Sequence, residues 1–321
     1  MSGLPLVSLC VPVYGVEKYI ERCAISLFSQ TYTNCEFLFV NDCTKDNSVK
    51  LLFTIIERYS YISNRVKIID HKYNKGLAAA RNTALEHVRG EFLIWVDADD
   101  YLSLDAVEKL VYQQQIGDFD IVTSNYVEEH NGYSKPVIRP HHESKTDMLN
   151  SVLMFNEAVT VWGQLIKTSI YSSYNLKCLE GVNMGEDYQV RPLLIYHAQN
   201  IAHLDDYLYH YECSNTLSYT NSYNFPSMYA SYKSIIYIYD KFTSLNLLNH
   251  VYVIKQSITN KVSHDLVLVG RYKSIEGYRF LHNILNTYNA KVKMPLIRRI
   301  LLYLPYRLLI MLFQIKDIIC R

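Results

Sequence analysis

The stretch FLIWVDADD, residues 92–100, joins five apolar residues directly to three carboxylates. A short apolar run without polar residues on either face predicts a fully buried strand over 92–96. The acidic cluster Asp97, Asp99 and Asp100 then follows the carboxyl end of that strand. Ligands of open α/β sheets bind at the carboxyl ends of the strands. This cluster is therefore the first candidate for a functional site.

The same alternation of buried strand and helix extends outward from this stretch. The pattern predicts strands over 7–13, 36–40, 66–69 and 120–124, and helices over 17–30, 47–59, 76–87 and 103–115. Strands that are apolar on both faces and alternate with helices predict an α/β fold. Its sheet is expected to be Rossmann-like and mostly parallel, with helices on both faces. Farther along, the pattern predicts helices over 144–155 and 185–197, a strand over 201–211 and helical structure over 226–288.

Composition and charge set limits on the class of protein. The 321 residues are 49% hydrophobic and 20% charged, which is ordinary for a globular chain. The formal net charge of +1 carries no signature of a nucleic-acid partner. Seven cysteines form no CxxC pair. Their odd number and spacing argue against a disulfide framework or a zinc site and favour a reducing, cytoplasmic compartment.

The C-terminal segment 291–321 differs from the rest of the chain. It holds seven Lys or Arg residues and one acidic residue, a formal charge of +6. Its apolar run is interrupted by Pro305 and Arg307 and is too short to span a membrane. Apolar bulk combined with aromatic and basic residues is typical of a segment that lies on a membrane surface. The alternative is a C-terminal helix packed on the protein.

The acidic cluster alone leaves two interpretations open. Three carboxylates within four residues repel one another unless a cation or solvent compensates them. Mg²⁺ or Mn²⁺ is the ion that such oxygen ligands favour. An ion held by one or two carboxylates can also neutralise a departing diphosphate. The alternative is a solvated loop whose charge stabilises the start of the next helix.

Three further features follow predicted strands or begin predicted helices. Asp42 follows the second strand, where it could bind a base or ribose or form a turn. Gly76 begins a helix whose free N–H groups could face an anion. Arg81, in that helix, is either part of a site or half of a surface ion pair. Glu186 and Asp187 could include a general base, or they are the acidic residues common at a helix start.

These features, in this order and spacing, resemble the family-2 inverting glycosyltransferases with the GT-A fold. The segments that carry the resemblance are VSLCVPVYGVEKY (7–19), SQTY (29–32), FVNDCTKDNS (39–48), NKG (74–76), ARN (80–82), GEF (90–92) and DADD (97–100). Weaker similarity occurs at VWGQL (161–165) and GED (185–187). The sequence departs from the family at Asn41, where Asp is frequent, and at Cys43, where Gly is frequent. The Cys43 departure puts the loop's shape in doubt, since Cys tolerates a positive φ poorly.

The resemblance implies roles at the nucleotide. Asp42 would bind the uracil or ribose, and Pro12 and Tyr14 would line the nucleotide pocket. Arg81 would help to hold the nucleotide-sugar. Asp97 and Asp99 would form the DxD pair that holds Mn²⁺ or Mg²⁺, with Asp99 the more direct ligand.

The resemblance also implies roles at the acceptor. Asp187 would be the catalytic base, and Glu186 would orient it or contact the acceptor. Trp162 would border the acceptor or sugar pocket. Residues 1–215 would form the catalytic domain, 216–290 a helical extension, and 291–321 a basic amphipathic tail.

The implied activity is transfer of a hexose or N-acetylhexosamine from a UDP-sugar to an acceptor hydroxyl, with inversion. The acceptor would be a sugar or a lipid-linked saccharide of a bacterial cell-surface polysaccharide. The tail would contact the cytoplasmic face of the inner membrane. A sugar nucleotidyltransferase is the alternative enzyme, but it usually needs a glycine- and basic-rich loop near its start, which this sequence lacks. A non-catalytic sugar-binding protein is a third possibility, against which the acidic pairs argue.

Overall fold

The computed structural model describes residues 3–215, 224–288 and 296–319. The strands are β1 Val7–Val13, β2 Cys35–Asn41, β3 Val66–Asp70, β4 Phe92–Trp95, β5 Tyr101–Leu102, β6 Ile121–His130, β7 Tyr133–Val137, β8 Leu165–Lys167 and β9 Ile201–Glu212. The helices are α1 Ile20–Phe28, α2 Ser48–Arg58, the 3₁₀ helix η1 Ser60–Arg65, α3 Leu77–Leu85, α4 Ala106–Gly117, α5 Lys145–Leu153, α6 Thr168–Ser173, α7 Glu186–His197, α8 Phe225–Ser244, α9 Leu248–Tyr272, α10 Ile275–Tyr288, α11 Leu296–Tyr303 and α12 Tyr306–Ile319.

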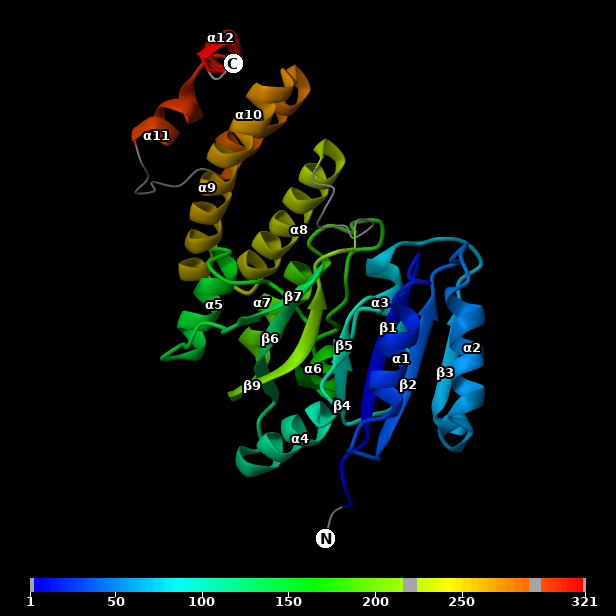
Figure 1. Ribbon diagram of the computed structural model, residues 1–321. Helices are drawn as coiled ribbons and strands as arrows, with labels where there is room; N and C mark the ends of the chain where they lie inside the picture. Colours follow the sequence, from blue (N-terminus) through cyan, green and yellow to red (C-terminus); the bar gives the residue numbers. More distant parts are fainter. Residues whose placement is uncertain (1–2, 216–223, 289–295, 320–321) are drawn as a thin grey trace. The chain divides into compact units, whose positions relative to one another are not determined.

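A nine-stranded sheet runs in the order β3-β2-β1-β4-β8-β6-β9-β5, with β7 paired to β6. The first four strands in this order are parallel, as the sequence predicts. The chain moves outward from β1 to β3 and then returns to β4 on the other side of β1 (Figure 1). Because such crossovers are right-handed, α3 lies on the opposite face from α1 and α2. The predicted α/β fold with helices on both faces is confirmed.

The second half of the sheet is mixed. Strands β6 and β9 are parallel, whereas β8 is antiparallel to both β4 and β6, and β5 and β7 are also antiparallel to their partners. Sequence patterns did not predict β5, β7 or β8. Strands β5 and β8 have only two and three residues, too few for a period to be recognised, and β7 is mostly exposed and contains Pro136.

The core of the parallel half follows from its residue pattern. All seven residues of β1 are buried, as expected for a strand covered on both faces. Helix α1 turns Ile20, Leu27 and Phe28 toward the sheet. The Phe28 ring meets the Phe37 ring edge-on, with centroids 5.1 Å apart. Burial of each such side chain contributes about 1.5–3 kcal/mol to folding.

Hydrogen bonds join the loop after β1 to the loop after β2, close to the candidate site described below. The backbone N–H of Gly15 donates to Thr44 Oγ1 at 2.9 Å, and that of Val16 donates to Ser48 Oγ at 3.1 Å. Asp46 accepts hydrogen bonds from both hydroxyls. Within this loop Cys43 has φ 57°, the left-handed conformation that glycine adopts without strain. Cys43 therefore adopts a backbone conformation typical of glycine although it carries a side chain.

The described residues divide into two compact units, 1–149 with 157–234, and 150–156 with 235–321. The second unit is helical, and the pattern predicted over 226–288 continues as α8, α9 and α10. Helices α11 and α12 pack on α9, where Leu302 and Leu309 are buried. The domain boundaries expected at 216 and 291 fall on residues outside the described ranges.

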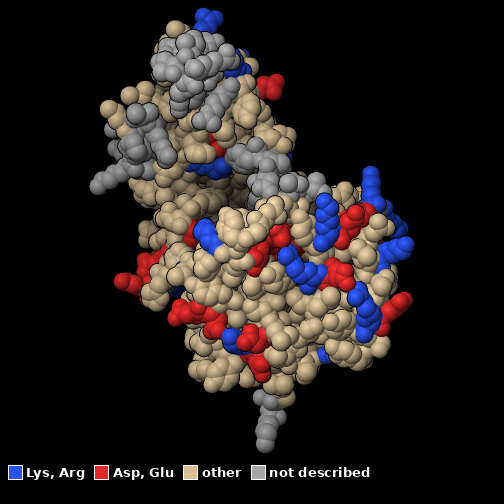
Figure 2. Space-filling view, in the orientation of Figure 1, with Lys and Arg blue, Asp and Glu red and all other residues tan. Residues whose placement is uncertain are grey.

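Two surface properties bear on partners. Across residues 3–215, 224–288 and 296–319, no helix has the length and hydropathy needed to cross a membrane. On the face seen in Figure 2, acidic and basic side chains are interspersed over the body of the molecule.

The left-handed conformation of Cys43 yields a stability prediction. Cys43→Gly should raise the free energy of unfolding by about 1 kcal/mol, because a non-glycine residue is strained there. Urea denaturation at constant pH measures the change. The matched control is Lys45→Gly, at an exposed position without a positive φ, which should lower stability. A loss of stability in both variants would contradict the prediction.

Candidate functional site

A buried arginine gathers three of the predicted site residues. Arg81 lies in α3, and its side chain is only 2% exposed. Its Nη2 atom is 3.1 Å from Asp97 Oδ1, 3.4 Å from Asp187 Oδ1 and 3.6 Å from Glu186 Oε1. The guanidinium also lies over the Trp95 ring, 5.3 Å from its centroid. Residues from α3, the end of β4 and the start of α7 thus share one cation.

Burial and charge set the protonation of this group. Burial and then the nearby Asp187 charge raise the pKa of Glu186 to about 8, although Arg81 opposes them. Burial also raises the pKa of Asp187 to about 6, again opposed by Arg81. For Arg81, burial opposes the charge, but the three carboxylates outweigh it and raise the pKa well above its usual value. Glu186 therefore holds its proton more tightly than Asp187 does.

Several buried polar atoms of this cluster make no hydrogen bond within the described residues. Within the described residues, Arg81 Nε and Nη1 and Asp187 Oδ1 are buried and accept or donate none. Asp187 Oδ2 accepts from the backbone N–H of Val161 at 3.3 Å. Buried polar atoms are rarely left in this state. The cluster therefore has unused capacity for a polar ligand.

The start of α7 presents the two acidic residues to Arg81. Gly185 is the residue before the helix, and its φ of 78° is one that a side chain would disfavour. Glu186 and Asp187 then occupy the first turn, where their charge suits the positive end of the helix. The sequence left two interpretations of this pair, a general base or ordinary acidic residues at a helix start. These are compatible, because the start of α7 contains both carboxylates and also places them beside Arg81.

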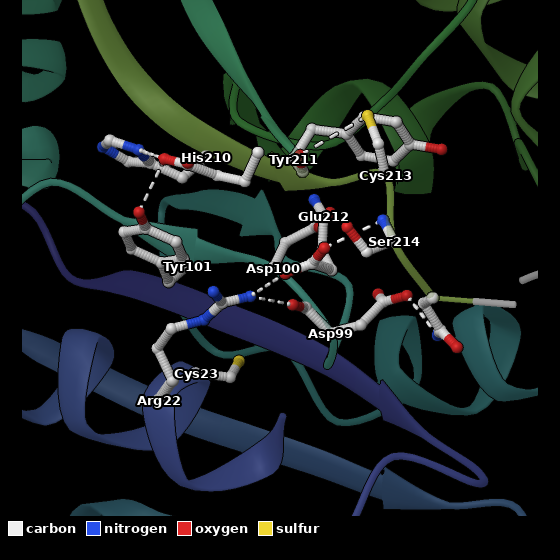
Figure 3. A network of polar contacts seen from close by, with 12 residues as sticks. Arg22, Cys23, Asp99, Asp100, Tyr101, His210, Tyr211, Glu212, Cys213 and Ser214 are labelled. Atoms are coloured by element: carbon white, nitrogen blue, oxygen red, sulfur yellow. Dashed lines mark hydrogen bonds and ion pairs between the residues drawn. The ribbon is translucent and has the colours of Figure 1, made fainter. Parts of the chain in front are cut away.

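The DxD pair differs in environment. Asp97 is 25% exposed at the side chain and is neutralised in part by Arg81. Asp99 Oδ2 accepts from Asn215 Nδ2 at 2.8 Å, and Arg22 donates to the Asp99 backbone oxygen (Figure 3). Burial, and next the charge of Asp97, raise the pKa of Asp99 to about 6. Asp99 is thus a carboxylate whose negative charge is poorly compensated.

Asp100 is a structural residue. It is fully buried, and its carboxylate accepts from the Tyr209 hydroxyl and, at 2.8 Å, from the backbone N–H of Glu212. The interpretation of the cluster as a cap for the following helix is wrong, since α4 begins at Ala106 after Asp105. Asp100 instead links the turn after β4 to β9 through these two hydrogen bonds.

Asp42 closes the start of α3. Its Oδ1 lies 2.7 Å from both His71 Nδ1 and the Lys75 backbone nitrogen, and its Oδ2 accepts from the Gly76 N–H at 2.7 Å. The N–H groups of Lys75 and Gly76, just before α3, thus bind this carboxylate, and whether the helix start also faces a free anion stays a prediction. The loop before α3 turns its N–H groups back toward the end of β2.

The remaining nucleotide residues lie at the end of β1. Pro12 is buried within the strand, opposite Val40 of β2, and Tyr14 follows the strand with 49% of its surface exposed. Asn183 fills the space beside Gly76 and accepts from the N–H of Ala78 at 3.2 Å. Whether Pro12, Tyr14 and Asp42 contact a nucleotide stays a prediction.

The donor set of the DxD pair fits a divalent ion. Asp97 and Asp99 offer carboxylate oxygens, the ligands that Mg²⁺ and Mn²⁺ prefer. The poorly compensated charge of Asp99 is one that a cation would balance. Mg²⁺ in such sites is held by one or two carboxylates together with substrate phosphates. A site of two protein ligands is therefore sufficient.

Sequence reasoning missed the residues that support the site. His71 directly follows β3, so its place at a strand end was a usable signal. Tyr209, Asn215 and Arg22 gave no such signal, because they meet the acidic cluster only through pairing of distant elements.

Comparisons with known proteins agree with this arrangement. Residues 8–167 match the model described as Glycosyl transferase family 2. An uncharacterized glycosyltransferase, EpsJ of Bacillus subtilis (strain 168), is 31% identical over 223 residues, which are 67% of this chain and 63% of EpsJ. A putative teichuronic acid biosynthesis glycosyltransferase, TuaG of the same strain, is 34% identical over 105 residues, 33% of this chain and 40% of TuaG. The chain thus spans less than two thirds of either relative.

A solved structure shares the fold. The crystal structure of S. aureus TarS in complex with UDP-GlcNAc has a TM-score of 0.65 at 18% identity. The match covers 88% of this chain and 80% of that chain. At this identity the likeness shows the GT-A fold alone.

The raised pKa of Glu186 yields a prediction for stability. An unfolded Glu loses its proton near pH 4.5 and the folded one near 8. Between these values the native state binds more protons, so wild-type stability should fall as pH rises. Glu186→Gln should make this fall shallower, while Asp187 and Asp99, whose pKa values are also raised, keep part of it. Urea midpoints at pH 5, 6, 7 and 8 measure it, with the exposed Glu180→Gln as control. Equal slopes for Glu186→Gln and wild type would refute the assignment.

Proposed function

The chain belongs to glycosyl transferase family 2, and we propose that it transfers a hexose or N-acetylhexosamine from a UDP-sugar to an acceptor hydroxyl with inversion. The observation that carries this proposal is the Arg81 guanidinium, which joins a DxD carboxylate, Asp97, to a helix-start carboxylate, Asp187. A donor diphosphate and an acceptor hydroxyl must meet at such a point. The TarS complex with UDP-GlcNAc supports a UDP-sugar as donor.

Asp187 is the proposed catalytic base. It removes the proton of the acceptor hydroxyl as that oxygen attacks the anomeric carbon, and the bond to the diphosphate breaks on the opposite side. Positive charge develops on the sugar ring, as in glycoside hydrolysis. A pKa of about 6 suits this role, because the group is ionised at neutral pH and still basic. Glu186, which holds its proton more tightly, orients Asp187 or contacts the acceptor.

Asp99, assisted by Asp97, is the proposed ligand of Mn²⁺ or Mg²⁺. When bound, such an ion takes up the charge of the departing nucleoside diphosphate. Arg81 binds one oxygen of Asp97 and so orients that carboxylate. Asn215 does the same for Asp99. Arg81 also places a fixed positive charge beside the nucleotide-sugar.

The nucleotide would lie over the ends of β1 and β2, with Pro12 and Tyr14 lining its pocket. Asp42 is the proposed contact for uracil or ribose. A carboxylate offers about four lone-pair positions, and Asp42 uses three of them on His71, Lys75 and Gly76. One position on Oδ2 is left for a donor on the nucleotide. Trp162, near the Val161 contact of Asp187, would border the sugar or acceptor.

The acceptor we propose is a sugar or lipid-linked saccharide of a cell-surface polysaccharide. TuaG, named for teichuronic acid biosynthesis, supports this context. An acceptor on a lipid requires the enzyme to work at a membrane surface, on the cytoplasmic face. Helices α11 and α12 have the composition for that contact. Leu301, Leu302 and Leu309 are buried, while Leu296, Ile300, Tyr303, Leu308, Met311 and Leu312 are exposed.

Two substitutions separate donor binding from chemistry. Asp187→Asn should lower turnover about 10²–10⁴-fold, since a general base contributes that much, and leave donor binding nearly unchanged. Asp99→Asn should lower turnover and also abolish the Mn²⁺-dependent rise in melting temperature with UDP-GlcNAc. The assay compares UDP-GlcNAc with Mn²⁺ against UDP-GlcNAc with chelator. Asp118→Asn, in the turn after α4, is the control. Near-normal turnover in Asp187→Asn would show that Asp187 is not the base.

The exposed apolar face of α11 and α12 leads to a membrane test. The full chain should sediment with vesicles containing phosphatidylglycerol, less so at high salt because exposed charges are screened. The double variant Ile300→Gln, Met311→Gln should stay in the supernatant. Leu248→Gln, at a 66% exposed position of α9, is the control and should still sediment. Binding by the double variant equal to that of wild type would refute this face as the contact.

A further inference from the structure

Three metal-binding side chains meet at a place separate from the DxD pair. Among the described residues, one ligand atom each of Glu128, His130 and Cys213 lies within 4.8 Å of the other two. Glu128 and His130 are two residues apart on β6 and therefore point to the same face. The N–H of Cys213 donates to the Glu129 backbone oxygen at 2.8 Å, which brings Cys213 alongside β6. Figure 3 shows Cys213 on the segment that leaves β9.

We propose that Glu128, His130 and Cys213 form a zinc site. Thiolate, imidazole and carboxylate are the three ligand types that zinc takes from proteins, and three protein ligands with one water complete a tetrahedral site. The mixed donors favour zinc over Mg²⁺ and Mn²⁺, which prefer oxygen. The site is therefore chemically distinct from the DxD pair. As zinc binds, the Cys213 thiol gives its proton to solvent.

A lysine pairs with one of the three proposed ligands, Glu128. Lys135 Nζ lies 2.9 Å from Glu128 Oε2, and its side chain is 60% exposed. His130 Nε2 lies 3.6 Å from the same Glu128 oxygen, and the His130 ring stacks on Tyr133 with centroids 4.6 Å apart. The histidine is thus oriented toward the carboxylate by its neighbour. The ammonium is on a long, solvated stem and can leave without disturbing the core.

The expected effect of zinc is an added tether on residues 213–215, which follow β9. Cys213 begins this segment, the N–H of Ser214 donates to Glu212 Oε1 at 2.9 Å, and Asn215 donates to Asp99. A bond from zinc to Cys213 would tether the segment to the β6–β7 hairpin. The link to catalysis rests on the proposed function, because it acts through Asn215 on Asp99. Zinc binding itself does not depend on that function.

The cysteine spacing in the sequence argued against a zinc site, but in the fold ligands that are distant in the chain lie close together. That inference rested on the absence of closely spaced cysteines, but these ligands come from β6 and from the residue after β9, which are far apart in the chain. Strands β6 and β9 are parallel partners with Glu129 opposite Glu212. This register brings residue 213 beside residues 128 and 130, and no local spacing could show it.

The test is metal binding by the full chain, first stripped with chelator. Zinc titration against a chromophoric chelator should give one tight equivalent and a rise in melting temperature of about 5 °C. Cobalt(II) should give a thiolate charge-transfer band. Cys213→Ser and His130→Asn should each abolish the tight equivalent and the band. Lys135→Met should tighten zinc binding several-fold, because it removes the competing ammonium.

Two controls separate this site from other binding. Cys43→Ser removes another partly exposed cysteine, and Asp99→Asn removes the proposed DxD ligand. Both should keep the tight equivalent and the cobalt band. The proposal is overturned if wild type binds no zinc tightly, if Cys213→Ser binds as wild type does, or if Asp99→Asn abolishes binding. Loss of activity in Asp99→Asn with zinc binding intact would leave the zinc site and the glycosyltransferase site independently established.

Discussion

The buried positive charge of Arg81 is the constraint on which the site depends. A guanidinium cannot lose its proton in a protein, so its burial requires nearby negative charge. Asp97, Glu186 and Asp187 supply that charge from β4 and α7. The sheet order brings the end of β4 beside β1, on which α3 packs. Because Arg81 belongs to α3 and needs these carboxylates, the packing of α3 on the sheet also determines where the first turn of α7 lies.

The same charge separates the roles of neighbouring carboxylates. Three carboxylates around one buried cation exceed its charge, so burial drives one of them to keep a proton. Glu186, whose pKa is raised further, is the better candidate for that residue. Two adjacent acids of different strength are what acid–base chemistry at neutral pH uses. Burial and neighbouring charge thus give these adjacent residues of α7 different acid strengths.

Much of this was predictable from the sequence, within definite limits. The parallel half was predictable because its strands are apolar on both faces. Asp97 and Asp187 were marked by a strand end and a helix start, whereas Arg81 was marked only by the helix that begins at Gly76. The mixed half of the sheet was not predictable, because a strand as short as β8, with three residues, shows no hydrophobic period. Asp42 was marked correctly as a strand-end residue, but its bonds to Lys75 and Gly76 depend on the turn before α3. Tyr209 and Asn215 belong to the site only through the place of β9 in the sheet.

The stretch 97–100 shows how one turn assigns three carboxylates to three tasks. Asp97 faces Arg81, which balances part of its charge, whereas Asp100 points into the protein and is held by Tyr209 and the Glu212 N–H. Asp99 lies between them, and its carboxylate accepts from the neutral amide of Asn215. Among the described residues it has no ion pair like the one that Asp97 makes with Arg81, and burial raises its pKa. A cation is drawn to the carboxylate that the fold has not neutralised, which is the physical reason for choosing Asp99 over its neighbours.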